Sequence, residues 1–311
     1  MSAPTINRMQ FHDRWYPGDP DALHRVLSAG TAAHRAAVPA AGAPLHDVRL
    51  AVLPHAGLAY SARGQMAFWD TVDPGELRAA VDRIVLVAPS HYVPIPGDTT
   101  VGGRFSGHET PFGTLPDGGT VADEDDRGTV EREHAVELLL PAIAATLGTE
   151  IPVSPVLVGA FSGPDAAADA ARRIVRRLAE QGVARGRVLW LVSSDATHYG
   201  RRFGWTPLGQ GRWSELADRL RSADTSLVSA AVSGDRARYW SDLARGTTVC
   251  GRFALAMAIE AQLRFLGSGT GPHGGRVAGR ILDYYASPDV TGSDEAEFVC
   301  YVTAVMEEAT V

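Results

Sequence analysis

Histidine and aspartate side chains stand at the ends of three apolar runs in this sequence. These side chains are His55, His91, Asp195 and His198, and they end the runs 48–57, 83–92 and 187–198. In open α/β sheets, ligands bind beside the carboxyl ends of the strands. Imidazoles that converge at one such edge suit a divalent metal. A single histidine there is more typical of a cap or of the border of the core, so the metal prediction depends on their coincidence.

A third metal ligand is predicted at Cys250, in the stretch "TTVCGRFALAMAIE". Thr247 or Thr248 could cap a helix there, which would place the thiol in the first turn. The helix dipole at that position lowers the pKa of a thiol and favours the thiolate that binds metal. The alternative is a small buried side chain without a ligand. The other cysteine, Cys300, lies in an alternating pattern and is interpreted as strand core.

Proton transfer is the chemistry that His198 suggests, because a histidine titrates near neutral pH. We expect His198 beyond the metal or at its rim, with Asp195 able to orient an imidazole. In "REHAVE", Glu133 and Glu137 are four residues apart and share a helix face. A polar first turn favoured by the helix dipole explains them equally well. His108 and Glu109 are further candidates for lining a pocket.

Several common catalytic groups are excluded. All 29 basic residues are arginine, so the chain has no Schiff-base lysine and no P-loop lysine. Neither a G-x-S-x-G elbow nor an H-E-x-x-H helix is present. A G-x-G-x-x-G match at Gly269, Gly271 and Gly274 follows a helical stretch instead of a strand, so we interpret it as a loop.

Composition indicates a soluble protein. The 311 residues are 45% hydrophobic and 21% charged, with a formal net charge of −7, which argues against a nucleic-acid partner. The sequence predicts no secretory signal, no membrane span and no disulfide scaffold. We therefore expect a cytoplasmic protein that does not bind membranes.

Strands and helices alternate along the chain, which predicts one α/β domain over residues 1–311 with a mostly parallel or mixed central sheet and helices on both faces. Further strands are expected at 151–161, 277–286 and 297–306, and helices at 133–147, 165–181, 214–232 and 251–266. Pro141 should kink or break the first of these helices. Residues 93–130 are rich in Gly, Pro, Thr and Asp, and are expected to form a long excursion with short strands, or a lid.

A family resemblance extends over essentially the whole chain. It is carried by "LPHAGLAYSARGQMAF", "VLVAPSHYVPIPGD", "ETPFGTLP", "REHAVELLLP", "IPVSPVLVGAF", "LVSSDATHYGRRF", "TTVCGRFAL" and "YYASPDVTGSD", in that order, and by the opening "RWYPGDPDAL". Together these segments resemble the Memo family, which includes the bacterial AmmeMemoRadiSam system protein B. One departure is Ser287-Pro288-Asp289, where the family usually has Ser-Gly-Asp.

The resemblance implies a fold related to the LigB-type class III extradiol dioxygenases. In those enzymes two histidines and a glutamate hold Fe(II), and another histidine is the acid/base. At the matching positions His55 and His91 resemble the histidine ligands, Cys250 resembles the third ligand, and His198 resembles the catalytic histidine. The other residues assigned to the substrate pocket or the surroundings of the metal are His134, Tyr60 and Glu109.

Three functions remain open on this resemblance. The first is an Fe(II)-dependent oxygenase, with copper as the alternative metal, that acts on a small organic substrate with O2. The second is a protein that binds a metal or a peptide without turnover. The third is a partner of a radical SAM protein or an AMMECR-type protein, since the sequence lacks the cysteine cluster of radical SAM enzymes.

Overall fold

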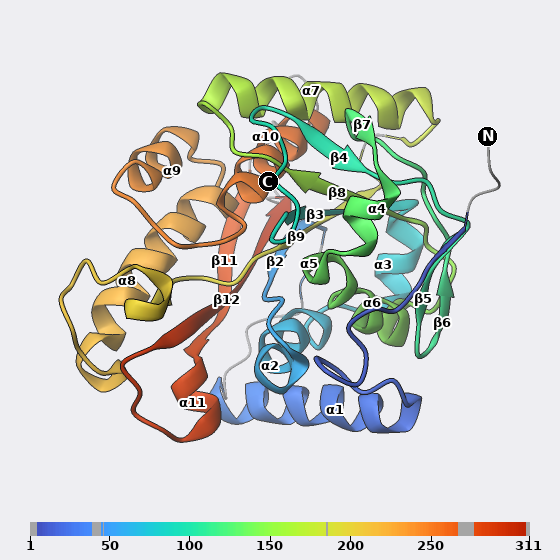
Figure 1. The fold of residues 1–311 in the computed structure, drawn as a ribbon. Coiled ribbons are helices and arrows are strands. Elements are labelled where there is room, and N and C mark those ends of the chain that lie inside the picture. Colours follow the sequence, from blue (N-terminus) through green and yellow to red (C-terminus); the bar gives the residue numbers. More distant parts are fainter. Residues whose placement is uncertain (1–4, 39–44, 46, 185, 267–276, 309–311) are drawn as a thin grey trace.

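A mixed β-sheet runs through the middle of the molecule, with helices on both faces (Figure 1). The computed structural model describes residues 5–38, 45, 47–184, 186–266 and 277–308. The strands of this sheet are β2 (Val48–Leu53), β3 (Arg83–Pro89), β4 (Thr100–Gly102), β7 (Glu124–Asp125), β8 (Val153–Val158), β9 (Val188–Ser193), β10 (His198–Tyr199), β11 (Val277–Ala286) and β12 (Phe298–Glu308). Their order is β10-β12-β2-β9-β3-β8-β4-β7, and β11 pairs with β12. The α/β prediction is confirmed.

Four parallel strands, β2, β9, β3 and β8, form the centre of the sheet. Their side chains are buried on both faces, which explains why the sequence shows continuous apolar runs instead of alternation. In β2, Leu50 and Val52 enter one core, and Ala51 and Leu53 enter the other. Since the parallel strands point the same way, their carboxyl ends meet at one edge of the sheet.

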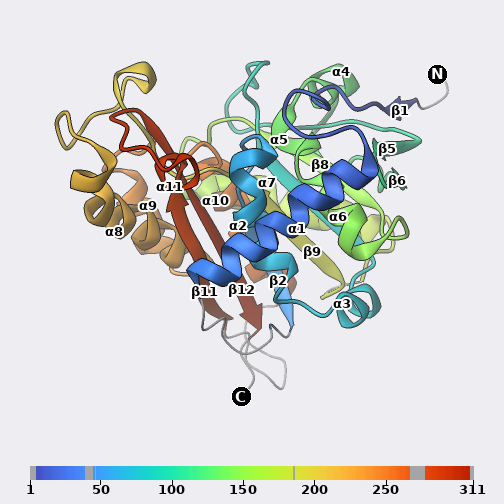
Figure 2. The same ribbon diagram turned by 90° about the horizontal axis from the view of Figure 1, so that it is seen from below.

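Two layers of helices cover the sheet. One layer holds α1 (Pro20–Ala37), α2 (Leu58–Trp69), α3 (Pro74–Ala80), α5 (His134–Glu137) and α6 (Leu140–Leu147). The other holds α7 (Pro164–Glu180), α8 (Trp213–Val232), α9 (Arg236–Leu243) and α10 (Arg252–Leu266). Figure 2 shows α1 and α2 lying across the first of these faces, with α8 and α9 beside β11 and β12. Within the described ranges, no helix is both long and apolar enough to cross a membrane.

Most of the predicted elements are present with shifted ends. The helix predicted at 133–147 is two helices, α5 and α6, and Pro141 lies in the first turn of α6, where its missing N–H costs nothing. The predictions at 165–181, 214–232 and 251–266 correspond to α7, α8 and α10. The glycine motif at Gly269, Gly271 and Gly274 lies outside the described residues.

The excursion at 93–130 contains short strands, as expected. Two of them, β4 and β7, extend the edge of the main sheet. Two others, β5 (Gly107–Thr110) and β6 (Gly113–Leu115), pair with each other, and β5 also pairs with β1 (Ile6–Asn7). The remaining short helices are α4 (Arg127–Glu131), η1 (Arg201–Phe203) and α11 (Ser287–Thr291). The N-terminal segment thus lies against the excursion.

Candidate metal centre

Three histidines converge at the carboxyl edge of the parallel strands. His55 follows β2, His91 follows β3, and His134 is the first residue of α5. One donor atom from each lies within 4.8 Å of the other two. The imidazole centroids of His91 and His134 are 4.5 Å apart, and that of His55 is 5.1 Å and 5.4 Å from those two. The strand ends therefore deliver two imidazoles to one point, and a helix start adds a third.

Ser193 determines which ring nitrogen of His55 carries the proton. The hydroxyl of Ser193 donates to the carbonyl of Ala135 at 2.6 Å, and its oxygen lies 2.7 Å from His55 Nδ1. Because the single hydrogen of that hydroxyl is already donated to Ala135, the hydroxyl oxygen can only accept from His55. Nδ1 of His55 therefore carries the proton, which leaves a lone pair on Nε2. Burial, followed by the charges of His91 and His134, holds the pKa of His55 well below 6.5. The imidazole is thus kept neutral, the form that binds metal.

Glu133 determines the protonated ring nitrogen of His91 in the same way. Its carboxylate accepts from the backbone N–H of His91 at 2.6 Å and lies 2.8 Å from Nδ1 of the same residue. A carboxylate only accepts, so His91 carries its proton on Nδ1 and presents Nε2. Burial alone would raise the pKa of Glu133, but the close contact with His134 and the hydrogen bonds from His91 hold that pKa well below its usual range. Glu133 is therefore an anion that orients a ligand.

His134 is the least constrained of the three imidazoles. Its Nδ1 lies 3.2 Å from Glu133 Oε1, yet this buried nitrogen has no hydrogen-bond partner because the geometry is poor. Aromatic rings surround it, with centroids 4.5 Å away at Trp15, 5.4 Å at Tyr92 and 5.8 Å at Phe11. Packing against these rings, instead of a hydrogen bond at Nδ1, thus positions the imidazole of His134.

Cys250 contacts this cluster through His55. Its Sγ lies 3.2 Å from His55 Nε2, and it accepts from the backbone N–H of Asp195 at 3.2 Å. The close approach needs Gly251, since a Cβ there would lie 2.4 Å from the side chain of Ser194. The expected lowering of the thiol pKa is wrong for the metal-free protein. Burial, and then the charge of Asp195, raise the pKa of Cys250 well above its usual range.

Asp195 holds the backbone beside the imidazoles. Its Oδ1 accepts from the N–H groups of His55 at 2.8 Å and of Ala56 at 3.3 Å, so its hydrogen bonds position the loop that carries His55. Burial raises the pKa of Asp195, although the charge of His198 and these N–H groups oppose the shift. The carboxylate thus ties the end of β9 to the end of β2.

His198 lies on β10, three residues after Asp195, and is half-buried. Its Nδ1 lies 3.2 Å from the carbonyl of Ala196, which only accepts, so Nδ1 is the donor and Nε2 keeps its lone pair. The hydroxyl of Thr248 accepts from the backbone N–H of His198 and donates to its carbonyl, both at 2.9 Å. Thr248 therefore clamps His198 instead of capping α10.

Comparisons with known proteins identify the family of this chain. The model of the family described as "Memo-like protein" matches residues 8–305. The chain belongs to the Memo family. It is 27% identical over 279 residues to the "Protein memo-1 homolog" of Caenorhabditis elegans, covering 86% of this chain and 74% of the relative. It is 27% identical over 270 residues to a "MEMO1 family protein" of Methanosarcina acetivorans, covering 83% and 85%.

The remaining site residues assigned through the Memo resemblance lie in different places. Tyr60 is 38% exposed near the start of α2, and its carbonyl accepts from the hydroxyl of Tyr285. Glu109, on β5, accepts from Arg8 and from the backbone of Met9. These bonds direct Glu109 to the N-terminal segment.

His108 and Glu137 also serve the packing of the chain. His108 is fully buried, and its two ring nitrogens lie 3.2 Å from Asn7 Nδ2 and 3.2 Å from Asp117 Oδ1. Glu137 accepts from the N–H groups of Gln10 and Phe11. Glu137 thus holds down the N-terminal segment that carries Phe11 and Trp15. Sequence reasoning missed these two rings, because no periodicity marks them.

Proposed function

We propose that this Memo family chain is a metal-dependent enzyme that binds Fe(II) and uses O2 on a small organic substrate. The supporting observation is the donor set: the hydrogen bonds at Nδ1 of His55 and His91 leave a lone pair on each Nε2, and both imidazoles lie beside His134. Imidazoles together with a thiol suit Fe(II), and copper as the alternative. When bound, the metal would supply redox activation of O2 and Lewis-acid polarisation of a substrate oxygen.

Cys250 is proposed as an anionic donor beside the imidazoles. A thiolate at this position would hold the ion together with the imidazole of His55. The Sγ of Cys250 and Nε2 of His55 are separated by 3.2 Å. The closeness of the two donor atoms supports Cys250 as a further ligand, although the sulfur lies outside the three-histidine group itself. The thiol would lose its proton on metal binding, so affinity should rise with pH.

His198 is proposed as the general acid/base. Its Nδ1–H is held by Ala196 and its backbone is clamped by Thr248, which leaves Nε2 to accept or return a substrate proton. The neighbouring rings of Phe11, Trp15 and Tyr92 would exclude water from one side of the site.

The test is anaerobic loading with Fe(II), followed by O2-uptake measurements with a panel of catechols, aminophenols and other small metabolites. We expect His198→Gln to retain the metal and to lose about 10²- to 10⁴-fold in kcat. Cys250→Ala and His55→Ala should lose metal and turnover together. Turnover that persists in His55→Ala and His198→Gln would exclude this mechanism.

A second candidate function is binding without turnover, favoured by the exposure of the aromatic wall. Tyr92 is 51% exposed and stacks on Phe11, with ring centroids 6.0 Å apart. Such a surface suits the side chain of a peptide. Metal-free protein that binds a peptide, and loses it in Tyr92→Ala, would favour this function. Association with a radical SAM or AMMECR-type protein remains a prediction from the resemblance alone.

A further inference from the structure

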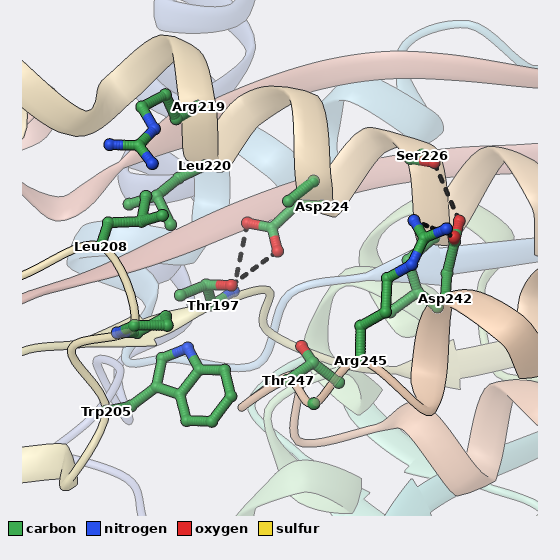
Figure 3. A pocket seen from close by; sticks show the side chains of 14 residues that line it. Thr197, Trp205, Leu208, Arg219, Leu220, Asp224, Ser226, Asp242, Arg245 and Thr247 are labelled. Carbon is green, nitrogen blue, oxygen red and sulfur yellow. Dashed lines mark hydrogen bonds and ion pairs between the residues drawn. The ribbon is translucent and has the colours of Figure 1, made fainter.

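A second cavity lies beyond β10, on the side of α8 and α9. Its volume is about 200 Å³. Figure 3 shows its wall, with Trp205 facing Leu208, Leu220 and Asp224 across the space, and Arg219 and Arg245 at its borders. Thr197 and Thr247 also line it, and they directly precede His198 and Thr248 in the chain. The cavity therefore adjoins the backbone that holds His198.

Trp205 forms a fixed flat wall of this cavity. Its backbone N–H donates to the carbonyl of Gly200, and its carbonyl accepts from the N–H of that residue at 2.9 Å. Gly246 lies against the ring, and a Cβ at that position would be 2.8 Å from the indole. Gly246 also has φ +89°, which a side chain rarely adopts. The backbone hydrogen bonds to Gly200 thus position the indole, and the missing side chain at Gly246 makes space for it.

The charges of the cavity are unevenly distributed. Arg245 is 3.0 Å from Asp242, so this cation is already paired. Arg219 is exposed, and within the described ranges no carboxylate lies at ion-pair distance from it. Asp224 is buried and accepts from Thr197 and from the hydroxyl of Tyr284. The available positive charge is at the border, and the negative charge is at the floor.

We propose that this cavity binds a small aromatic carboxylate with a single ring. A dry cavity of about 150 Å³ holds one benzene ring, so the volume here suits one ring with a short substituent. The ring would stack on Trp205, and its carboxylate would pair with Arg219. Repulsion from Asp224 fixes the orientation, with the anionic end toward the border.

A ligand in the cavity would alter the position of the backbone that carries His198. Thr197 donates to Asp224 through its hydroxyl at 2.6 Å and through its backbone N–H at 3.3 Å. A ring placed between Trp205 and Asp224 therefore presses on the residue just before His198. The ligand acts as a regulator of the proton-transfer residue, and its binding requires no metal.

The experiment uses benzoate and phenylacetate as probes and benzyl alcohol as the uncharged control, in calorimetric titrations of the full chain. Ala223→Phe fills the opening from an exposed position on α8. Arg219→Gln removes the free cation, and Arg176→Gln, at another exposed arginine, is its matched control. His55→Ala distinguishes this cavity from the imidazole cluster. Thermal unfolding verifies that each variant is folded.

We expect saturable 1:1 binding of the carboxylates that Ala223→Phe abolishes. Arg219→Gln should weaken benzoate about tenfold and leave benzyl alcohol unchanged, while Arg176→Gln and His55→Ala bind like the parent. The NMR resonances of the His198 ring should shift on titration. Binding that survives Ala223→Phe but is lost in His55→Ala would overturn the proposal, as would an absence of saturable binding at millimolar probe. An unchanged His198 resonance would overturn the regulatory role.

Discussion

The imidazole cluster and the cavity beyond β10 each contain a buried carboxylate, and the two have opposite pKa shifts. Glu133 lies against His91 and His134, and its pKa is held well below 4.5 despite burial. For Asp224 burial outweighs the hydrogen bonds from Thr197 and Tyr284, and its pKa rises from 3.8 to about 6. Both side chains are at most 2% exposed. The hydrogen-bonding partners therefore determine the direction of the pKa shift. Imidazoles, which can carry a positive charge, stabilise a carboxylate anion more strongly than neutral hydroxyl groups do.

The difference separates two kinds of polar site in one chain. Glu133 binds only one nitrogen of His91 and so leaves the other available to a ligand. Asp224 instead accepts from two neutral hydroxyl groups, those of Thr197 and Tyr284, and orients no imidazole. The contributions of the two carboxylates to stability also change with pH in opposite directions. That of Glu133 is present above pH 4.5 and is lost as the pH falls, whereas that of Asp224 is lost as the pH rises.

The largest effect is expected when an imidazole is removed. His55→Ala and His91→Ala should each abolish stoichiometric Fe(II) binding, because two neighbouring donors cannot hold the ion as tightly as the complete set. Metal content after anaerobic reconstitution and desalting is the measurement. His108→Gln is the matched control, since both nitrogens of His108 are engaged in the fold. Full metal content in His55→Ala would show that the imidazole cluster is not the metal site, and the contrast with the cavity beyond β10 would then fail.

The second effect concerns the charge of Asp224. Its pKa of about 6, against 3.8 when unfolded, corresponds to about 3 kcal/mol at about 1.4 kcal/mol per pH unit. This contribution is fully present below pH 3.8 and is lost as the pH rises through about 6. Asp224→Asn should therefore gain stability relative to the parent by about that amount between pH 4 and pH 7. Urea unfolding across this range measures it, and parallel pH profiles would refute the assignment.

Glu133→Gln should have a smaller effect, on metal affinity. An amide can still accept from His91 Nδ1–H but brings no charge, and losses of such ligand-orienting groups typically cost about 10- to 100-fold in affinity. Competition titrations with a chelator give the value. Glu137→Gln, on the next turn, is the control, because Glu137 contacts the N-terminal segment instead of an imidazole. An equal loss in both variants would indicate a general disturbance of α5.

The strand ends were predictable from the sequence because parallel strands share an edge. His55 and His91 follow apolar runs, and the helical patterns of α7, α8 and α10 are long enough to recognise. The same reasoning could not place His134, which begins a four-residue helix broken from α6 near Pro141. The break itself was predicted from Pro141 and is present, but the sequence did not show that it would separate a four-residue helix that brings His134 to the two strand-end histidines.

The balance of forces at Cys250 was not predictable from the sequence either. A position near the start of a helix predicts a lowered thiol pKa. In the fold Cys250 lies two residues before α10 and beside Asp195, and desolvation, followed by the charge of Asp195, raises the pKa of the thiol. The cavity beyond β10 could not be predicted from the sequence either. Its wall joins Trp205, Asp224 and Gly246, which no motif connects. Contacts between distant segments carry this information, and a single sequence does not display them.

The smallest effect is expected from Thr197→Val, which removes one hydroxyl donor from Asp224 and keeps the shape of the side chain. The backbone N–H of residue 197 and the hydroxyl of Tyr284 would remain as donors, so the loss should be about 1 kcal/mol. It should be larger at pH 7 than at pH 5, because the hydroxyl stabilises the charged carboxylate more than the protonated one. Urea unfolding at both pH values measures the difference. Thr225→Val, whose hydroxyl donates to a helix carbonyl, is the control and should show no such dependence. If both variants lose the same amount at both pH values, Thr197 does not control the charge of Asp224, and its hydroxyl serves only packing.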